Sequence, residues 1–254
     1  MSTEAVIQEQ ARLRLSERGS RADDKQTPVR RQFVNFTFYH VRPEWRLLDE
    51  RTKEEAKREF INTVDGFRRQ LIIQTYSLTG LRTDADFMIW RIGYELDPFQ
   101  EMSARINRTV LGRHLEVTQS YLSMTKRSIY MDKENPEHVE DRLHIIPGKA
   151  KYLFVYPFVK TRAWYALPFD ERQEMMDEHI RVGSKYPSVK LNTTYSFGLD
   201  DQEFVVAFET DEPADFLDLV QDLRETKASM YTLRDTPMYT CRLRALTEIL
   251  EEIG

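Results

Sequence analysis

FVNFTFYHVRPEW (residues 33–45) and YLFVYPFVKTRAW (residues 152–164) are the two stretches that decide the fold. Each is rich in the aromatic and β-branched residues that favour strands, and each ends in a basic residue and then a tryptophan. A charged stretch with helical character follows each one, DERTKEEAKREF in the first copy and DERQEMMDEH in the second. The copies begin at residues 33 and 152, about 119 residues apart, which indicates an internal duplication.

The similarity continues along both copies. TYSLTGLRTDADFMIWRIGYE (75–95) matches TYSFGLDDQEFVVAFETDE (194–212), and each is followed by an amphipathic helix, expected at about 97–109 and 213–224. Tyrosine-containing strands, SYLSM and PMYTCRL, end the copies. The order strand, helix, strand, strand, helix, strand is that of a ferredoxin-like unit. Chance similarity between two ordinary α+β halves is the alternative, and the matched segments make it unattractive.

We therefore predict an α+β fold of two tandem ferredoxin-like units, of the dimeric α+β barrel type. The apolar sheet faces would be buried by packing together or in one barrel-like sheet, with helices outside. Residues 1–31 are polar and are expected to form a mobile tail. The first unit is expected at 32–131, a linker loop at 132–150 around DKENPEHVEDR, and the second unit at 151–254.

Composition narrows the class of protein. The formal net charge is -5 and the sequence pI about 5.7, which argues against a general nucleic-acid-binding surface. No apolar run is long enough to span a bilayer, and the charged N-terminus does not resemble a secretory signal. Cys241 is the single cysteine, so an internal disulfide framework and a cysteine-cluster metal site are excluded. We expect a cytoplasmic protein.

A duplicated fold needs only one copy to carry a site, so differences between the copies are informative. Fifteen residues after the tryptophan, the first copy has Phe60 and the second has His179. A lone histidine on an apolar helix face is ordinarily a buried structural residue, and ligation of a metal by protein atoms alone would need more ligands nearby. A porphyrin needs only one axial ligand from the protein, because the macrocycle supplies four nitrogens. The residues expected on one helical face with His179 are Met175, Met176, Val182 and Gly183.

A second difference lies in the first strand of the second copy. Tyr156 and Lys160 are four residues apart and should share one face of an extended strand. A strand tyrosine usually fills a core, and a lysine usually lies at a solvated edge. Together on an inward face, they could instead be a redox-active phenol and a cationic partner for a propionate.

Several separated segments resemble the chlorite dismutase-like haem protein family, and within it the coproheme decarboxylases. The resemblance extends from about residue 32 to residue 246. The segments that carry it are YPFVK at 156–160, WYALPFDER at 164–172, EH at 178–179 and GLDDQEF at 198–204, with LGRHL at 111–115 and RDTPMYT at 234–240.

The resemblance implies a tandem ferredoxin-like fold with haem in the C-terminal unit and assembly as a homo-oligomer, often a pentamer. It implies that His179 is the proximal iron ligand, that Tyr156 forms the radical that removes propionate carboxylates, and that Lys160 lies near the reactive propionate. Trp164 would lie beside the haem pocket. The implied reaction uses hydrogen peroxide to decarboxylate iron coproporphyrin III at two propionates, with haem b as the product.

The distal side departs from chlorite dismutases, which place an arginine in the strand before the GLDD turn. Anchoring on that turn puts Leu191 there, whereas a gapless count from His179 gives Asn192. Neither side chain is the arginine, so true chlorite dismutase activity is not expected. Some decarboxylases use a loop histidine as the distal base, and His144 could fill that role. Arg142 is a candidate propionate contact; the alternative for both is exposure to water.

Two other functions remain open at this point. One is a haem-binding or haem-delivery protein, or a weak peroxidase, that keeps His179. The other is a ferredoxin-like oligomer without a porphyrin. For His40, His114 and His138 we expect surface or packing roles.

Overall fold

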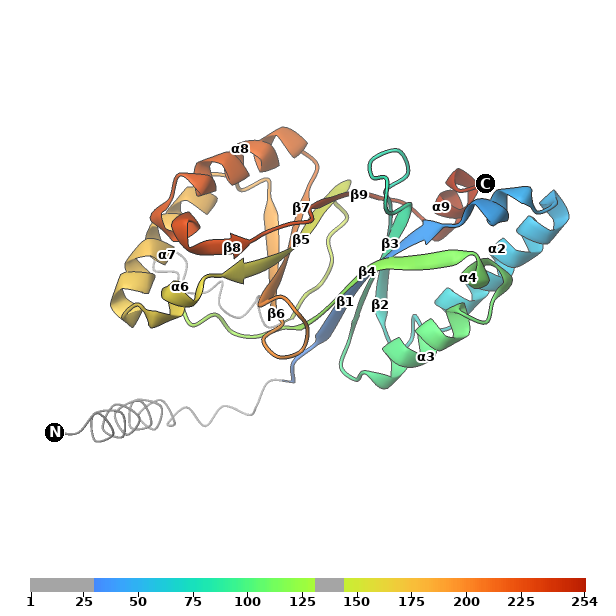
Figure 1. Cartoon of the computed structure of the whole chain (residues 1–254), viewed down its shortest axis with the longest axis horizontal. Coiled ribbons are helices and arrows are strands. Elements are labelled where there is room, and N and C mark those ends of the chain that lie inside the picture. The colour runs from blue at the N-terminus through green and yellow to red at the C-terminus, as the bar shows by residue number, and fades with distance from the viewer. Residues whose placement is uncertain (1–29, 131–143) are drawn as a thin grey trace. The chain divides into compact units, whose positions relative to one another are not determined.

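The computed structural model describes residues 30–130 and 144–254. Antiparallel strands make up its framework (Figure 1). The first half contributes β1 (Phe33–Val41), β2 (Ile72–Ser77), β3 (Phe87–Gly93) and β4 (Leu115–Met124). The second half contributes β5 (Tyr152–Lys160), β6 (Lys190–Tyr195), β7 (Phe204–Thr210), β8 (Thr232–Arg234) and β9 (Tyr239–Leu243).

Helices connect these strands. Those of the first half are η1 (Pro43–Leu47), α2 (Glu50–Asp65), α3 (Asp97–Ile106) and α4 (Val110–Arg113). Those of the second half are α6 (Arg162–Ala166), α7 (Phe169–Gly183), α8 (Pro213–Arg224), η2 (Lys227–Tyr231) and α9 (Leu246–Glu252).

The sheet closes on itself. Its strand order is β7-β6-β4-β1-β3-β2-β9-β5, and a further antiparallel pairing between β5 and β7 joins the two ends. Each half keeps the ferredoxin-like order, β4-β1-β3-β2 and β9-β5-β7-β6. The halves join through two short pairings, Tyr76 and Ser77 of β2 with β9, and Met124 of β4 with Tyr195 of β6. The result is a barrel, with β8 added beside β5.

Alternation along the strands sorts side chains between the barrel interior and its outer surface. One apolar cluster fills the interior, and it includes Phe36, Trp90, Leu153 and Val155. A second cluster lies between the first half of the sheet and its helices, and a smaller third cluster lies on the outer surface of the second half. The barrel therefore has a continuous apolar core, and each half covers its outer surface with its own helices.

Helix α2 shows how sequence determines this packing. The Asp49 carboxylate caps the helix by accepting a hydrogen bond from the backbone N–H of Thr52 at 3.0 Å. Ala56, Phe60 and Val64 then recur every four residues and are all buried against the sheet. Figure 1 shows α2, α3, α4 and α9 over the first half and α6, α7 and α8 over the second.

The chain ends on the first half. Leu250 of α9 joins the apolar cluster around α2, and the Trp45 indole donates a hydrogen bond to the carbonyl of Gly254 at 2.5 Å. Sequence patterns did not predict α9 or the short strand β8. The helix expected at about 97–109 ends at Ile106, because Thr109 caps the separate helix α4 by accepting a hydrogen bond from Gly112 N.

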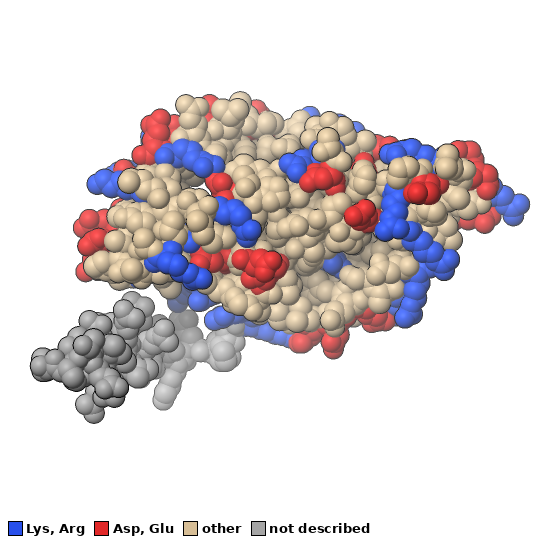
Figure 2. All heavy atoms as spheres, in the orientation of Figure 1, with Lys and Arg blue, Asp and Glu red and all other residues tan. Residues whose placement is uncertain are grey.

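The predicted α+β fold of duplicated ferredoxin-like units is confirmed. The boundaries proposed at 131 and 151 stay predictions, and most of the expected tail and of the linker lies outside the described residues. No helix in 30–130 or 144–254 is long and apolar enough to cross a membrane. On the face shown in Figure 2, acidic and basic side chains are interspersed.

Candidate functional site

Strand β5 lies at the centre of the second half, paired with β7 on one side and β9 on the other. Leu153 and Val155 point into the barrel, whereas Phe154 and Tyr156 belong to the cluster on the outer surface. Helix α8 covers this surface with Phe216, whose ring stacks on Phe154 at 3.9 Å between centroids. Tyr156 therefore lies on the outer surface of the sheet, in the apolar cluster that α8 covers.

Tyr156 is a buried phenol on this surface. Only 7% of the residue is exposed, and its ring stacks on Phe208 of β7 at 5.9 Å. Among the described residues its hydroxyl has no hydrogen-bond partner. Burial, reinforced by the negative charge of Asp235, raises the pKa of Tyr156 above its ordinary value. The phenol therefore stays protonated at physiological pH.

Lys160 is also buried, where β5 gives way to α6. Its ammonium donates a hydrogen bond to the carbonyl of Ala228 at 2.5 Å and lies 4.6 Å from the centre of the Trp164 ring. Burial lowers the pKa of Lys160 to about 8, against an opposing effect of Glu203. The structure thus brings two predicted site residues, Lys160 and Trp164, into contact.

His179 lies on α7, and its Nδ1 atom is buried without a hydrogen-bond partner. Burial lowers the pKa of His179 to about 4, and the positive charge of Lys160 acts in the same direction. The imidazole is therefore neutral at pH 7. A buried unpaired ring nitrogen is costly in a core residue, so its presence points to a missing partner.

The surroundings of His179 are looser than those of its counterpart in the first half. Phe60 on α2 is fully buried, whereas His179 and its expected neighbours on α7 are only half-buried. Gln173 is the single buried residue of α7. The expected helical face exists, but it does not pack tightly on the sheet as α2 does.

Strand register shows which way the two residues considered for the distal position, Leu191 and Asn192, point. Leu191 pairs with Phe208, so it lies on the outer surface with Tyr156, and it is 46% exposed. Asn192 points into the barrel instead, where its amide donates hydrogen bonds to Glu209 at 2.9 Å and to the carbonyl of Ala207 at 3.4 Å. Leu191 is therefore the residue that faces the same space as Tyr156.

Comparison with known proteins shows the family to which the chain belongs. The family model described as chlorite dismutase matches residues 53–244. The chain belongs to the chlorite dismutase family. It is 36% identical over 166 residues to a coproheme decarboxylase of Mycolicibacterium smegmatis, covering 65% of this chain and 70% of that protein. It is 31% identical over 172 residues to a protein of Natronomonas pharaonis named for heme binding, covering 61% of this chain and 29% of that longer protein.

Solved structures agree with this membership. A variant of chlorite dismutase from Candidatus Nitrospira defluvii superposes with a TM-score of 0.80 at 26% identity, covering 87% of this chain and 94% of that one. A structure described as a novel heme-binding protein from Thermus thermophilus gives a TM-score of 0.77 at 26% identity, covering 87% of this chain and 94% of that one.

The structure shows less of the other candidates. His144 is exposed, and within the described residues no hydrogen bond or ion pair joins it to Tyr156, Lys160 or His179. Arg142 and His138 lie outside those residues. His40 pairs with the Asp86 carboxylate at 2.9 Å, and His114 lies against the Trp45 ring, in keeping with the packing roles expected for them.

The residues that line this surface from neighbouring elements were not predicted from the sequence. Phe208 stacks on Tyr156, and the alternation in VVAFET could have placed it opposite a β5 residue. Glu203 accepts hydrogen bonds from the backbone N–H of Lys160 at 2.8 Å and the Tyr165 hydroxyl at 2.6 Å. Tyr231 lies beside Trp164 at 5.5 Å. Contacts across three elements such as these leave no local pattern.

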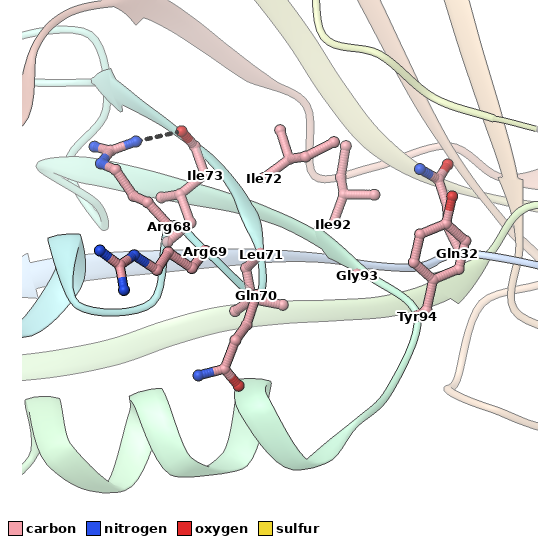
Figure 3. A pocket seen from close by; sticks show the side chains of 10 residues that line it. All are labelled: Gln32, Arg68, Arg69, Gln70, Leu71, Ile72, Ile73, Ile92, Gly93 and Tyr94. Atoms are coloured by element: carbon pink, nitrogen blue, oxygen red, sulfur yellow. Dashed lines mark hydrogen bonds between the residues drawn. The ribbon is translucent and has the colours of Figure 1, made fainter.

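A cavity in the first half of the chain is separate from this site. A cavity of about 410 Å³ lies in the first half, between the turn after α2 and the ends of β2 and β3 (Figure 3). None of the predicted site residues lines it, and the Arg68 side chain there is already bonded to Asp65 and to the carbonyl of Ile73. Among the described residues, no group of three His, Cys, Asp or Glu side chains could hold a metal ion. Iron at His179 would need its other ligands from a macrocycle.

Proposed function

We propose that this chain is a coproheme decarboxylase, which uses hydrogen peroxide to convert two propionates of iron coproporphyrin III into vinyl groups and so forms haem b. The observation that carries the proposal is Tyr156, a buried tyrosine on the outer surface of the second half of the sheet, whose hydroxyl has no hydrogen-bond partner among the described residues. The 36% identity to a coproheme decarboxylase supports it.

The residues present fit an iron porphyrin. The neutral imidazole of His179 has an unpaired buried nitrogen, and one ring nitrogen is what a porphyrin iron requires of a protein. The half-buried face of α7 and the aromatic surface of Phe154 and Phe208 are the apolar walls that a flat macrocycle prefers. We propose His179 as the proximal ligand.

Lys160 would orient the substrate. Its pKa of about 8 leaves the ammonium mostly charged at pH 7, while its burial makes a carboxylate a strong partner. Trp164, in contact with that ammonium, would form the adjacent wall. The contact with the carbonyl of Ala228 holds the charge in place until a propionate binds.

Tyr156 would carry the oxidation to the propionate. When bound, the iron porphyrin supplies the redox chemistry that hydrogen peroxide initiates. Because the pKa of Tyr156 is raised, the phenol loses its proton only when it also loses an electron, and the resulting tyrosine radical abstracts hydrogen from the propionate. Each propionate consumes one hydrogen peroxide and one proton and yields one vinyl group, one carbon dioxide and two waters.

Leu191 and His144 would have different roles on the distal side. A leucine cannot stabilise a developing anion, so we propose that chlorite dismutation is absent. His144 is the remaining candidate for the base that accepts the proton of peroxide. Arg142 remains a proposed propionate contact.

A second candidate is a haem-binding or haem-delivery protein or a weak peroxidase. It is favoured by the two similar proteins named for heme binding. The buried phenol distinguishes the two functions, since binding and delivery need no residue that can be oxidised at position 156. The resemblance further supports a cytoplasmic homo-oligomer, such as a pentamer, and analytical ultracentrifugation of the porphyrin-loaded chain would test the assembly.

The test compares Tyr156→Phe with a matched control, Tyr152→Phe, four residues earlier on β5. Both variants keep the aromatic ring, and Tyr156→Phe keeps the stack on Phe208. We expect Tyr156→Phe to bind iron coproporphyrin III like the wild type but to form no decarboxylated product, as read by mass spectrometry. Full conversion by Tyr156→Phe, or equal loss in Tyr152→Phe, would refute the role of Tyr156.

A further inference from the structure

Two side-chain nitrogens on α7 are buried and have no hydrogen-bond partner among the described residues. One is Nδ1 of His179, and the other is Nε of Arg172, seven residues earlier in the same helix. Seven residues make almost two full turns, so the two side chains leave the helix on the same face, about 10 Å apart along its axis. Ligation of iron would explain an imidazole there, whereas the proposed chemistry gives Arg172 no role.

The guanidinium of Arg172 is held along one edge. Its Nη1 atom donates a hydrogen bond to the Tyr130 hydroxyl at 3.3 Å, and Cζ lies 5.7 Å from the centre of the Phe169 ring. No carboxylate in the described parts of the chain forms an ion pair with Arg172. The Nε atom, on another edge of the guanidinium, therefore has neither an acceptor nor a counter-charge there.

Arg172 lies at one end of a row of aromatic rings, and Lys160 lies at the other. The Lys160 ammonium is 4.6 Å from the centre of the Trp164 ring. The Tyr130 ring contacts both Trp164 and Phe169, at 6.2 and 6.0 Å between ring centroids. Like Arg172, Lys160 has no ion pair with a carboxylate in residues 30–130 or 144–254. The row therefore carries one cation without a carboxylate partner at each end.

This arrangement suits a flat ligand that carries several carboxylates. A buried guanidinium costs free energy unless acceptors satisfy its N–H groups. A carboxylate satisfies two parallel N–H groups at once, and the planar fork of an arginine is suited to that geometry. Iron coproporphyrin III has four propionates, of which Lys160 accounts for one.

We propose that Arg172 binds a propionate of the porphyrin other than the one assigned to Lys160, with its Nε edge as the donor and Tyr130 holding the guanidinium in place. The inference rests on the proposed function in taking an iron porphyrin as the ligand. It concerns binding, so it can be tested without any turnover.

The first measurement is the affinity for iron coproporphyrin III. We expect Arg172→Gln to weaken it by about ten- to a hundredfold at pH 7, because a charge-assisted pair of hydrogen bonds is lost. The affinity for the tetramethyl ester should stay as in the wild type, which also shows that the variant is folded. Arg181→Gln is the matched control and should leave both affinities unchanged, because Arg181 carries the same charge on the exposed, opposite face of α7.

A double variant shows whether the two cations hold different carboxylates. If they do, the fold losses in affinity of Arg172→Gln and Lys160→Met should multiply when the substitutions are combined. A double variant that binds no more weakly than the weaker of the two single variants would show that both cations act on one carboxylate, and would overturn the inference.

The second measurement detects the contact in the wild-type chain by nuclear magnetic resonance. The Nε–H signal of Arg172 is assigned by its absence from the spectrum of Arg172→Gln. Zinc coproporphyrin III is the probe, because it is diamagnetic and accepts one axial nitrogen. We expect it to move the signal downfield, as for an N–H group that gains a carboxylate acceptor, and we expect no such shift with its tetramethyl ester.

An unchanged affinity of Arg172→Gln for iron coproporphyrin III, an equal loss for the acid and the ester, or an Nε–H signal that does not move would each overturn the inference. Binding by the wild type without decarboxylation would refute the proposed function alone, and the affinities of the variants would then still decide the role of Arg172. A wild type that does not bind iron coproporphyrin III would overturn both.

Discussion

Replacing His179 by phenylalanine, the residue that occupies the matching position of the first half as Phe60, separates folding from iron binding. In the porphyrin-free protein the substitution removes a buried nitrogen that has no hydrogen-bond partner. An unsatisfied buried polar atom costs about 1–3 kcal/mol, so at pH 7 we expect His179→Phe to be at least as stable as the wild type. A residue kept at a cost to stability is typical of a functional site.

The pH dependence of stability gives the size of the contribution of His179. The pKa of His179 is about 4 in the folded chain, against an ordinary value of 6.5. Between these values the unfolded chain binds a proton that the folded chain does not, so stability falls as the pH falls through this window. The full difference corresponds to about 3 kcal/mol, of which about 2 kcal/mol is lost between pH 7 and pH 5. His179→Phe lacks this loss.

Urea unfolding of both proteins at pH 7 and pH 5 measures the effect. Other groups that titrate are common to the two chains and cancel in the comparison. We expect the stability advantage of His179→Phe to grow by about 2 kcal/mol at the lower pH. An advantage that is the same at both pH values would show that His179 is not held neutral by burial, and the argument for a ligating imidazole would lose its basis.

Three further tests use substitutions at other positions. Lys160→Met should weaken binding of iron coproporphyrin III by roughly ten- to a hundredfold at pH 7 and leave the affinity for its tetramethyl ester unchanged. The affinity of the wild type should fall as the pH rises through the Lys160 pKa of about 8, and the variant should not show this fall. Equal loss of affinity for acid and ester in a calorimetric titration would contradict this. Leu191→Arg should change the free energy of unfolding by less than about 1 kcal/mol, because the side chain is half exposed. Asn192→Arg should lower it by about 3 kcal/mol or more, because it places a charge inside the barrel. A larger loss of stability in Leu191→Arg than in Asn192→Arg, measured by urea unfolding, would refute the strand register. Gly112→Ala should lower the free energy of unfolding by about 2 kcal/mol or more in thermal unfolding, because the new Cβ would lie 1.8 Å from the carbonyl oxygen of Ile106. Gly183→Ala is the control and should be tolerated, because the space around Gly183 is open.

Repetition in the sequence was sufficient to predict the fold. The matched strands around residues 33–45 and 152–164 and the shared turn segments determine two units of the same topology. The pairings of β2 with β9 and of β4 with β6 join these units into one barrel. Helix α9 and strand β8 were not predictable in this way, because neither has a counterpart in the first copy. Helix α9 is stabilised by its contact with the cluster around α2, which is distant in sequence.

The candidate site was predictable only where the copies differ. His179 stands out because Phe60 occupies the same place in the first copy, and Tyr156 stands out within a strand of apolar residues. Which of Leu191 and Asn192 lies on the same sheet face as Tyr156 depends on a strand register that no local pattern determines, and the pairing of Leu191 with Phe208 shows it. Glu209, which accepts the hydrogen bond from Asn192 inside the barrel, went unnoticed because its partners lie in two segments separated from it in the sequence, strand β6 and the chain before β5.

The most direct test of the central claim is a stoichiometric titration of the iron coproporphyrin III complex with hydrogen peroxide, followed by mass spectrometry of the porphyrin. One peroxide per complex should remove one carbon dioxide and two hydrogens, and a second should repeat that loss to give haem b, with the spectrum of His179 ligation present throughout. Bleaching of the porphyrin without either product, or products that also form in Tyr156→Phe, would contradict the account.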